Sequence, residues 1–238
     1  MGEEVRRAAA WGVHALTATG LILAAVAAVL IVRGDDAAIR SALLLLLAAM
    51  VIDAWDGALA RRLRVGERVP GLDGRRLDDI VDFHTYTSLP LLLIWRVGAL
   101  PGDLAWLLVT PLLASAYGFS QVDAKTDDGF FLGFPSFWNV VALYVFLLRP
   151  APWLTAAVIA TLAILTFVPS TYLYPSRGGR LNRITALFGA AWGLLIAVLL
   201  TGMLEGMRTW TLISLAFPAW YLGASWLGNR RASAREQA

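Results

Sequence analysis

The sequence predicts an all-α integral membrane protein that crosses the bilayer many times, because of its composition and its recurring apolar stretches. Apolar residues make up 58% of the 238 residues, charged residues only 16%, and the mean hydropathy is +0.66. A soluble domain has roughly 45–50% apolar and about 25% charged residues. Apolar stretches of about 17–25 residues, long enough to span a bilayer as helices, recur along the chain. The composition excludes a soluble enzyme, and the absence of cysteine excludes a thiolate metal site.

Eight membrane-spanning helices are expected, at residues 10–32, 39–60, 78–95, 103–121, 136–149, 152–170, 184–201 and 209–228. The first is longer than the apolar region of a signal peptide, so it is expected to be retained. The fifth is short, and Phe130–Phe137 is expected to extend it or to lie in the membrane interface. The segment Arg149–Pro152 contains two prolines and predicts a tight helical hairpin. Because no repeat or linker divides the chain, residues 1–238 are expected to form one domain.

Basic residues are distributed unevenly over the loops between these spans. Eight spans place both termini on one side of the membrane, and 15 of the 20 Lys and Arg residues fall on that side. Loops on the cytoplasmic side of a membrane protein carry the excess of Lys and Arg. The sequence therefore predicts that both termini are cytoplasmic.

Acidic and small residues are spaced at helical intervals around the loop that joins the second and third spans. Residues three or four apart lie on one face of a helix, and a short loop makes consecutive helices antiparallel neighbours. Four carboxylates are therefore expected to converge just inside the cytoplasmic surface. The residues of this constellation are Asp53, Asp56, Gly57 and Ala60 in the second span, and Gly74, Asp78 and Asp82 at the start of the third.

Burying these acids in a membrane needs compensation. Each acid well inside the bilayer costs about 2.5–3.5 kcal/mol on insertion scales, so four cost on the order of 10 kcal/mol. The arginines of the loop at residues 61–76 could neutralise them in a salt-bridge network, but that leaves the small residues unexplained. Carboxylate oxygens are also the ligands that Mg²⁺ and Mn²⁺ prefer. Two such ions are the favoured interpretation.

The two segments read Asp-Ala-Trp-Asp-Gly-Ala-Leu-Ala-Arg at residues 53–61 and Gly-Arg-Arg-Leu-Asp-Asp-Ile-Val-Asp at residues 74–82. This pattern resembles the signature of the CDP-alcohol phosphotransferase family, D-x-x-D-G-x-x-A-R followed by G-x-x-x-D-x-x-x-D. The interval between Arg61 and Gly74 is longer than is usual in the family and is similar to that of the bacterial phosphatidylcholine synthase branch. The segments at residues 11–14, 123–128, 133–139 and 174–177 resemble that branch too.

The resemblance implies transfer of a phosphatidyl group from CDP-diacylglycerol to an alcohol, with release of CMP, at the cytoplasmic face of a bacterial inner membrane. It implies metal ligands at Asp53, Asp56, Asp78 and Asp82, with Asp82 also as general base, and nucleotide or diphosphate contacts at Asp56, Gly57, Ala60, Arg61 and Gly74. Two alternatives stay open: the small residues could serve only to pack helices closely, and Arg61 could serve only as an anchor at the cytoplasmic surface. A homodimer is expected only by analogy with the family, and no nucleic-acid partner is expected.

Choline is the acceptor that the resembling branch implies. A quaternary ammonium donates no hydrogen bond and is held by aromatic faces. The candidates near the cytoplasmic ends of the spans are Tyr117, Trp138 and Tyr172, although aromatic belts at membrane interfaces use the same residue types. His14 and His84 are expected to have packing or hydrogen-bonding roles.

Two other functions stay open at this point. Arg177, Arg180 and Arg183 could bind a phosphorylated acceptor such as glycerol 3-phosphate or inositol phosphate. Acids within a membrane also occur in transporters, where they line the path of a cation or of choline. The lack of acids in the later spans and of inverted repeats counts against a transporter.

Overall fold

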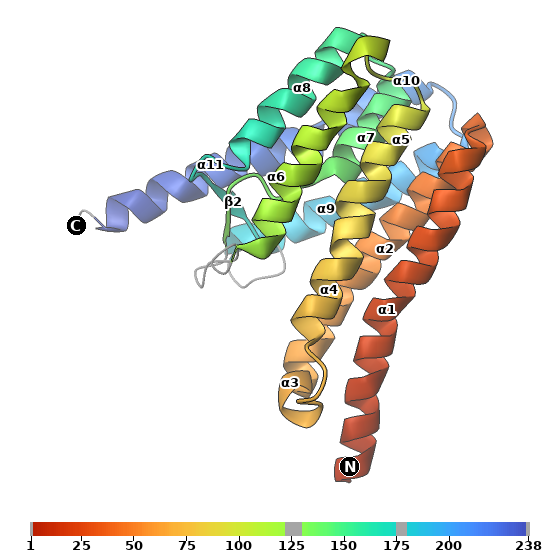
Figure 1. The fold of residues 1–238 in the computed structure, drawn as a ribbon. Helices are drawn as coiled ribbons and strands as arrows, with labels where there is room; N and C mark the ends of the chain where they lie inside the picture. Colours follow the sequence, from red (N-terminus) through yellow and green to blue (C-terminus); the bar gives the residue numbers. More distant parts are fainter. Residues whose placement is uncertain (1, 122–129, 175–179, 237–238) are drawn as a thin grey trace.

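An antiparallel pair of long helices, α1 (Glu3–Arg33) and α2 (Asp36–Leu63), forms one side of the molecule (Figure 1). The computed structural model describes residues 2–121, 130–174 and 180–236, without the side chains of residues 228–236. Gly34, with a φ of 76°, follows the end of α1, and Asp35 caps α2, because its carboxylate accepts a hydrogen bond from the Ala38 N–H at 3.0 Å.

A third long helical segment, called the rod below, lies against α1 and begins after the short helix α3 (Val65–Arg68). It consists of α4 (Gly74–Asp82), a π-helical segment η1 (Phe83–Ser88) and α5 (Leu89–Arg96), which follow one another without a break. Asp73 caps its beginning by accepting from the N–H groups of Arg75 and Arg76. Pro90 lacks an N–H and cannot continue the α-helical hydrogen-bond pattern, while Leu89 donates five residues back to His84. The proline thus accounts for a π segment at this point.

The rest of the chain packs around this rod and α2. The segment η2 (Gly102–Leu108) is a 3₁₀ helix that continues into α6. The main hydrophobic core includes buried side chains of α1, α2, α5, α7, α8 and α9, among them Ile94, Trp138 and Leu199. The remaining elements are α6 (Val109–Ser120), β1 (Phe130–Leu132), α7 (Trp138–Leu148), α8 (Pro152–Leu165), β2 (Thr171–Leu173), α9 (Arg180–Thr201), α10 (Met207–Ser214) and α11 (Ala216–Glu236).

Two short strands depart from the expected helical pattern. β1 and β2 pair antiparallel, with Phe131 opposite Tyr172. Residues 130–132 therefore neither extend the fifth expected span nor form a helix, and α8 ends at Leu165 rather than at residue 170. Pro135 and Pro169 stand in the connecting segments, where each would break a helix. The fold is otherwise helical, as the sequence predicts.

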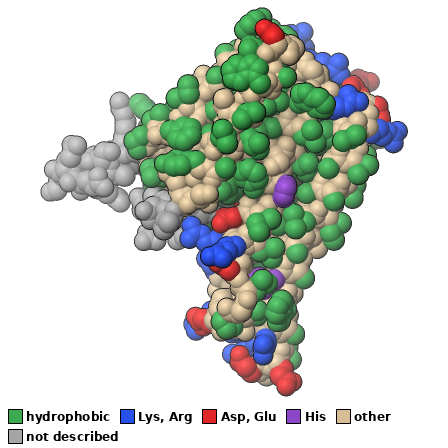
Figure 2. Space-filling view, in the orientation of Figure 1, with side chains coloured by type: hydrophobic (Ala, Val, Ile, Leu, Met, Phe, Trp, Pro, Cys, Tyr) green, Lys and Arg blue, Asp and Glu red, His purple; other side chains and the backbone are tan. Residues whose placement is uncertain are grey.

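The helices have the length and apolar surface of a membrane protein. Among the described residues, four helices are long and apolar enough to cross a bilayer, namely Glu3–Arg33, Asp36–Leu63, Gly102–Ser120 and Arg180–Thr201. Trp138–Leu148 and Pro152–Leu165 are shorter apolar helices. Figure 2 shows hydrophobic side chains over a broad area of the surface, with charged side chains gathered at its upper right edge and over its lower third. An all-α membrane protein is therefore confirmed. The third and eighth expected spans each consist of shorter helical pieces, divided by η1 and at Leu215.

Candidate active site

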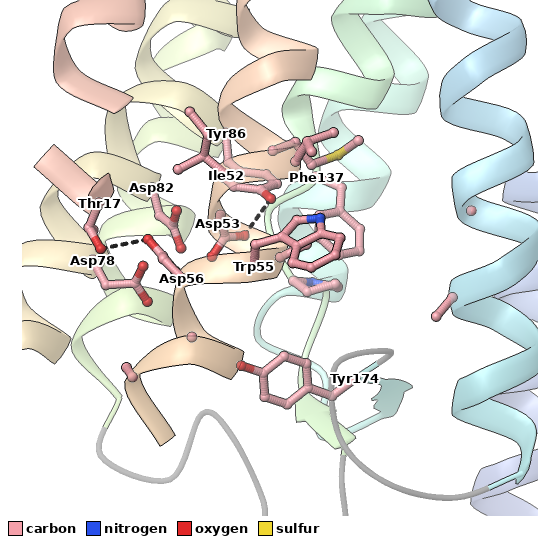
Figure 3. A pocket seen from close by; sticks show the side chains of 18 of the residues that line it. Thr17, Ile52, Asp53, Trp55, Asp56, Asp78, Asp82, Tyr86, Phe137 and Tyr174 are labelled. Atoms are coloured by element: carbon pink, nitrogen blue, oxygen red, sulfur yellow. Dashed lines mark hydrogen bonds between the residues drawn. The ribbon is translucent and has the colours of Figure 1, made fainter. Parts of the chain in front are cut away.

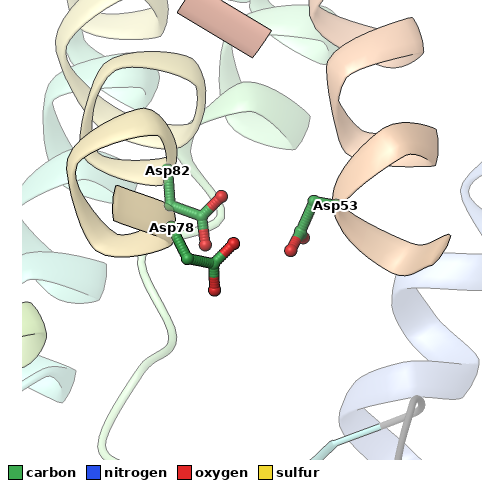
Figure 4. Close-up of side chains that lie close together, drawn as sticks. All are labelled: Asp53, Asp78 and Asp82. Carbon is green, nitrogen blue, oxygen red and sulfur yellow. The ribbon is translucent and has the colours of Figure 1, made fainter. Parts of the chain in front are cut away.

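Three carboxylates from two helices meet at one point (Figure 4). Asp53 comes from α2, and Asp78 and Asp82 come from successive turns of α4. One oxygen of each carboxylate lies within 4.8 Å of the others. Asp82 is buried, and the other two are partly buried. Hard oxygen ligands at this spacing suit a divalent cation such as Mg²⁺ or Mn²⁺, so the residues fit the ion that the sequence suggests.

The fourth acid of the constellation, Asp56, lies beside this group but outside it. Asp56 is buried, one turn after Asp53 on α2, and its Oδ2 accepts a hydrogen bond of 2.6 Å from the Thr17 hydroxyl on α1 (Figure 3). The helix α1 therefore contributes to the site, although it carries none of the expected metal ligands. A hydroxyl donor to a buried carboxylate also fixes the direction in which the other carboxylate oxygen points.

A tyrosine holds Asp53 in a similar way. The Tyr86 hydroxyl donates to Asp53 Oδ2 at 2.7 Å. Tyr86 lies in η1, four residues after Asp82, so it continues the stripe formed by Gly74, Asp78 and Asp82. Sequence reasoning missed both Tyr86 and Thr17. The four-residue interval could have indicated Tyr86, whereas no acid of α1 lies close to Thr17 in the sequence and could have indicated that threonine.

The four acids line a large cavity of about 2400 Å³. Pockets for drug-sized ligands have roughly 300–1,000 Å³, so this one has room for a lipid. Its polar lining includes the four acids together with Arg61 and Arg75, and its apolar lining includes side chains of α2 and α9 such as Leu47, Leu194 and Ala197. A cavity of this kind suits a ligand with a charged head and apolar chains.

The expected nucleotide contacts all line this cavity: Asp56, Gly57, Ala60, Arg61 and Gly74. The two glycines differ in what surrounds them. A Cβ on Gly57 would meet only Arg61 Nη1, at 3.4 Å, among the described atoms, so the protein itself leaves space there. A Cβ on Gly74 would lie 2.7 Å from His14 Cε1, so a larger residue would have to displace the His14 ring between α4 and α1. The buried His14 side chain thus has a packing role against Gly74.

The three expected choline contacts are not among the residues that line the cavity. Trp138 is fully buried in the core, where its indole N–H donates to Ser115 at 2.8 Å. Tyr172 packs edge-on against Phe134. Tyr117 is exposed, and its hydroxyl accepts from Gln121 at 2.7 Å. The structure therefore places these rings away from the acids.

Other aromatic side chains do line the cavity, among them Tyr86, Phe131, Phe137 and Tyr174. Arg180 and Arg183, suggested for a phosphorylated acceptor, are not among the lining residues, and Arg177 lies outside the described part of the chain. The segment at residues 123–128 and most of the segment at 174–177, both similar to the resembling branch, also lie outside it.

Comparison with known proteins supplies the family. No protein-family model matches the sequence. The phosphatidylcholine synthase of Pseudomonas aeruginosa is 40% identical over 174 residues, which are 73% of this chain and 72% of that protein. The phosphatidylcholine synthases of Legionella pneumophila and Bradyrhizobium diazoefficiens are 34% and 40% identical, over 90% and 79% of this chain and 86% and 70% of theirs. Similarity of this extent across most of each sequence shows that the chain belongs to the phosphatidylcholine synthase family.

Proposed function

We propose that this protein transfers the phosphatidyl group of CDP-diacylglycerol to choline and releases CMP. The observation that carries the proposal is the group of three carboxylates, within 4.8 Å of one another, in the lining of a lipid-sized cavity. Membership of the phosphatidylcholine synthase family supports it and identifies the chain as an enzyme of phospholipid synthesis.

The arrangement in the membrane is part of this proposal. Eight spans in a single domain, with both termini in the cytoplasm of a bacterium, account for the 15 of 20 basic residues on one side. The N-terminus, α3 and the beginning of α4 lie at the same end of the molecule in Figure 1. The acids near this end would face the cytoplasm, where choline and the nucleotide of the donor are soluble, while the acyl chains stay in the bilayer.

The acids are proposed as metal ligands. Asp53, Asp78 and Asp82 would hold one Mg²⁺ or Mn²⁺, and Asp56 would complete the set for a second ion. When bound, such ions polarise the diphosphate oxygens and stabilise the charge on the departing phosphate. Thr17 and Tyr86 support this function by orienting Asp56 and Asp53.

The reaction itself needs a proton acceptor, for which Asp82 is proposed. Asp82 takes the proton of the choline hydroxyl while the choline oxygen forms a bond to the phosphorus that carries diacylglycerol. The bond between that phosphorus and the bridging oxygen of the diphosphate breaks, and CMP leaves with the electron pair. Gly57 and Ala60 would leave room for the nucleotide, Gly74 lines the same cavity, and Arg61 would contact the nucleotide phosphate.

The test uses the purified full chain in liposomes that contain CDP-diacylglycerol, with Mn²⁺ or Mg²⁺. Choline, glycerol 3-phosphate and inositol phosphate are supplied in turn, and CMP and lipid products are measured. Phosphatidylcholine and CMP should form in equal amounts with choline. CMP release with another acceptor but none with choline would overturn the proposal, as would choline flux without CMP. Light scattering on the purified protein in detergent, before it is placed in liposomes, tests for a homodimer.

A further inference from the structure

A row of aromatic rings leads away from the acids along the wall of the cavity. Tyr86 lies 6.1 Å from Phe137 between ring centroids, Phe137 lies 6.4 Å from Phe131, and Phe131 lies 4.5 Å from Tyr174. All four residues line the cavity, and we call them the aromatic row. They come from η1, from the segment at residues 130–137 and from the residue after β2, so only the fold brings them together.

The aromatic row begins at the acids themselves. Through its hydroxyl, Tyr86 donates to Asp53 at 2.7 Å, while its ring contacts Phe137. Figure 3 shows Asp53, Tyr86, Phe137 and Tyr174 bordering the same space. A ligand with one end at Asp53 or Asp82 would therefore have its other end against the first two rings.

The position of Phe137 is held by an unusual backbone. Ser136, which precedes it, has a φ of 56°, a conformation that side chains other than glycine rarely adopt. The N–H groups of Ser136 and Trp138 donate to the carbonyls of Phe134 and Ser136 at 2.9 and 2.8 Å, so the segment bends twice in succession. Strained backbone of this kind persists where the surrounding structure enforces it. Here the bend places Phe137 in the cavity wall while the next residue, Trp138, is fully buried in the core.

The chemistry of the row suits a cation that has no hydrogen to donate. A quaternary ammonium is attracted to aromatic faces within about 6 Å of the ring centroid, and more strongly where water is excluded. Tyr86 is buried, and Phe131, Phe137 and Tyr174 are partly buried. In choline, only two carbons separate the ammonium nitrogen from the hydroxyl, so a molecule held by these rings can present its hydroxyl to the acids.

We propose that Tyr86 and Phe137 bind the trimethylammonium group of choline, and that Phe131 and Tyr174 extend this subsite along the cavity wall. The proposal rests on the function proposed above and deepens it, because it assigns acceptor specificity to rings that border the acids. Tyr86 then has two functions, since its hydroxyl orients Asp53 and its ring faces the acceptor.

The test compares choline with 3,3-dimethylbutanol, which has the same shape and hydroxyl but a neutral carbon in place of the ammonium nitrogen. The full chain in liposomes with CDP-diacylglycerol and Mn²⁺ is assayed as Phe137→Leu and Tyr174→Leu, which keep apolar bulk but remove the aromatic face. Loss of one desolvated cation–aromatic contact should lower the ratio of kcat/KM for choline to that for dimethylbutanol about tenfold for Phe137 and less for Tyr174. The KM for CDP-diacylglycerol should stay within about twofold.

Two controls separate binding from folding. Phe137→Tyr and Tyr174→Phe keep the aromatic faces and should retain the preference for choline. Tyr117→Leu removes a ring that lies outside the cavity lining and should also leave the ratio unchanged. Should Phe137→Leu fail to fold, Tyr174→Leu and the double variant with Phe131→Leu carry the same comparison.

An unchanged ratio in the leucine variants, with the wild-type protein still making phosphatidylcholine, would overturn the choline subsite alone. Failure of the wild-type protein to use choline at all would instead overturn the proposed function. The two failures are therefore distinguishable in one set of assays.

Discussion

The two sides of the cavity are built in different ways. The acidic side comes from α2 and α4, which are joined by one short connection, and its residues follow helical intervals within residues 53–82. The aromatic side is assembled from η1, the segment before α7 and the residue after β2, which lie far apart in the sequence. The acidic side would supply the chemistry common to phosphatidyl transfer, and the aromatic side would select the alcohol. Substitution of Asp82 on the acidic side should therefore lower kcat, whereas substitutions on the aromatic side should lower kcat/KM for choline.

The largest effect is expected on the acidic side, at Asp82. Asp82→Asn removes the proposed general base and one proposed metal ligand with almost no change in volume. Loss of general-base catalysis alone should lower kcat by about 10²–10⁴-fold. CMP release measures the rate, and binding of labelled CDP-diacylglycerol to the same variant should largely survive. Full activity in Asp82→Asn would remove this residue from the mechanism.

The metal ligands themselves are tested by Asp53→Asn and Asp78→Asn. Titration of the purified protein with Mn²⁺, followed by electron paramagnetic resonance, measures binding without any turnover. Loss of one of three converging carboxylates should weaken Mn²⁺ binding strongly, and Tyr86→Phe, which removes only the hydrogen bond to Asp53, should weaken it by about 10-fold or more. Wild-type Mn²⁺ affinity in both aspartate variants would contradict a metal site here.

A smaller effect is expected at Thr17, which supports the acidic side from α1. Thr17→Val keeps the shape of the side chain but removes the hydroxyl that donates to Asp56, so kcat/KM for CDP-diacylglycerol should fall by about 10-fold. Thr17→Ser should retain most of the activity. Thr155→Val is the matched control, because this buried threonine has a hydroxyl with no hydrogen-bond partner among the described residues. Equal effects in Thr17→Val and Thr155→Val would argue against a role for the hydroxyl.

The smallest effects should distinguish the two glycines of the site. At Gly57, where the cavity leaves space, Gly57→Ala should leave the melting temperature unchanged or slightly raised and increase the KM for CDP-diacylglycerol. At Gly74, where a Cβ would meet His14, Gly74→Ala should lower the melting temperature by a few degrees, in line with overpacking that costs about 1–3 kcal/mol. Thermal unfolding of both variants and their KM for CDP-diacylglycerol test this difference. A lower melting temperature in Gly57→Ala than in Gly74→Ala would show that Gly57 is needed for helix packing.

Sequence reasoning could predict the acidic side because its residues repeat at intervals of three and four along two consecutive helices. It identified the all-helical membrane fold and the acids that now lie together as Asp53, Asp78 and Asp82. It did not place Asp56 apart from this group, because spacing along a helix carries no information on the Thr17 hydroxyl that approaches from another helix.

The aromatic side was beyond prediction for a different physical reason. Aromatic residues are common at membrane interfaces, so residue type alone does not separate Trp138, which fills the core, from Phe137, its neighbour in the cavity wall. The choice between the two depends on the backbone bend at Ser136 and on the pairing of β1 with β2. Both depend on contacts between distant segments, which no local pattern reveals.

The π-helical segment between Asp82 and Pro90 determines which side chains α4 and α5 present to their neighbours, α2 and α7. A π turn adds one residue to a helix, which rotates everything beyond it by about 100° relative to an uninterrupted α-helix. Below the turn the rod presents carboxylates to α2, and above it apolar side chains pack against α7. The extra residue thus changes the orientation of α5 around the helix axis relative to α4. The carboxylates of α4 can therefore face α2 while the apolar side chains of α5 face α7.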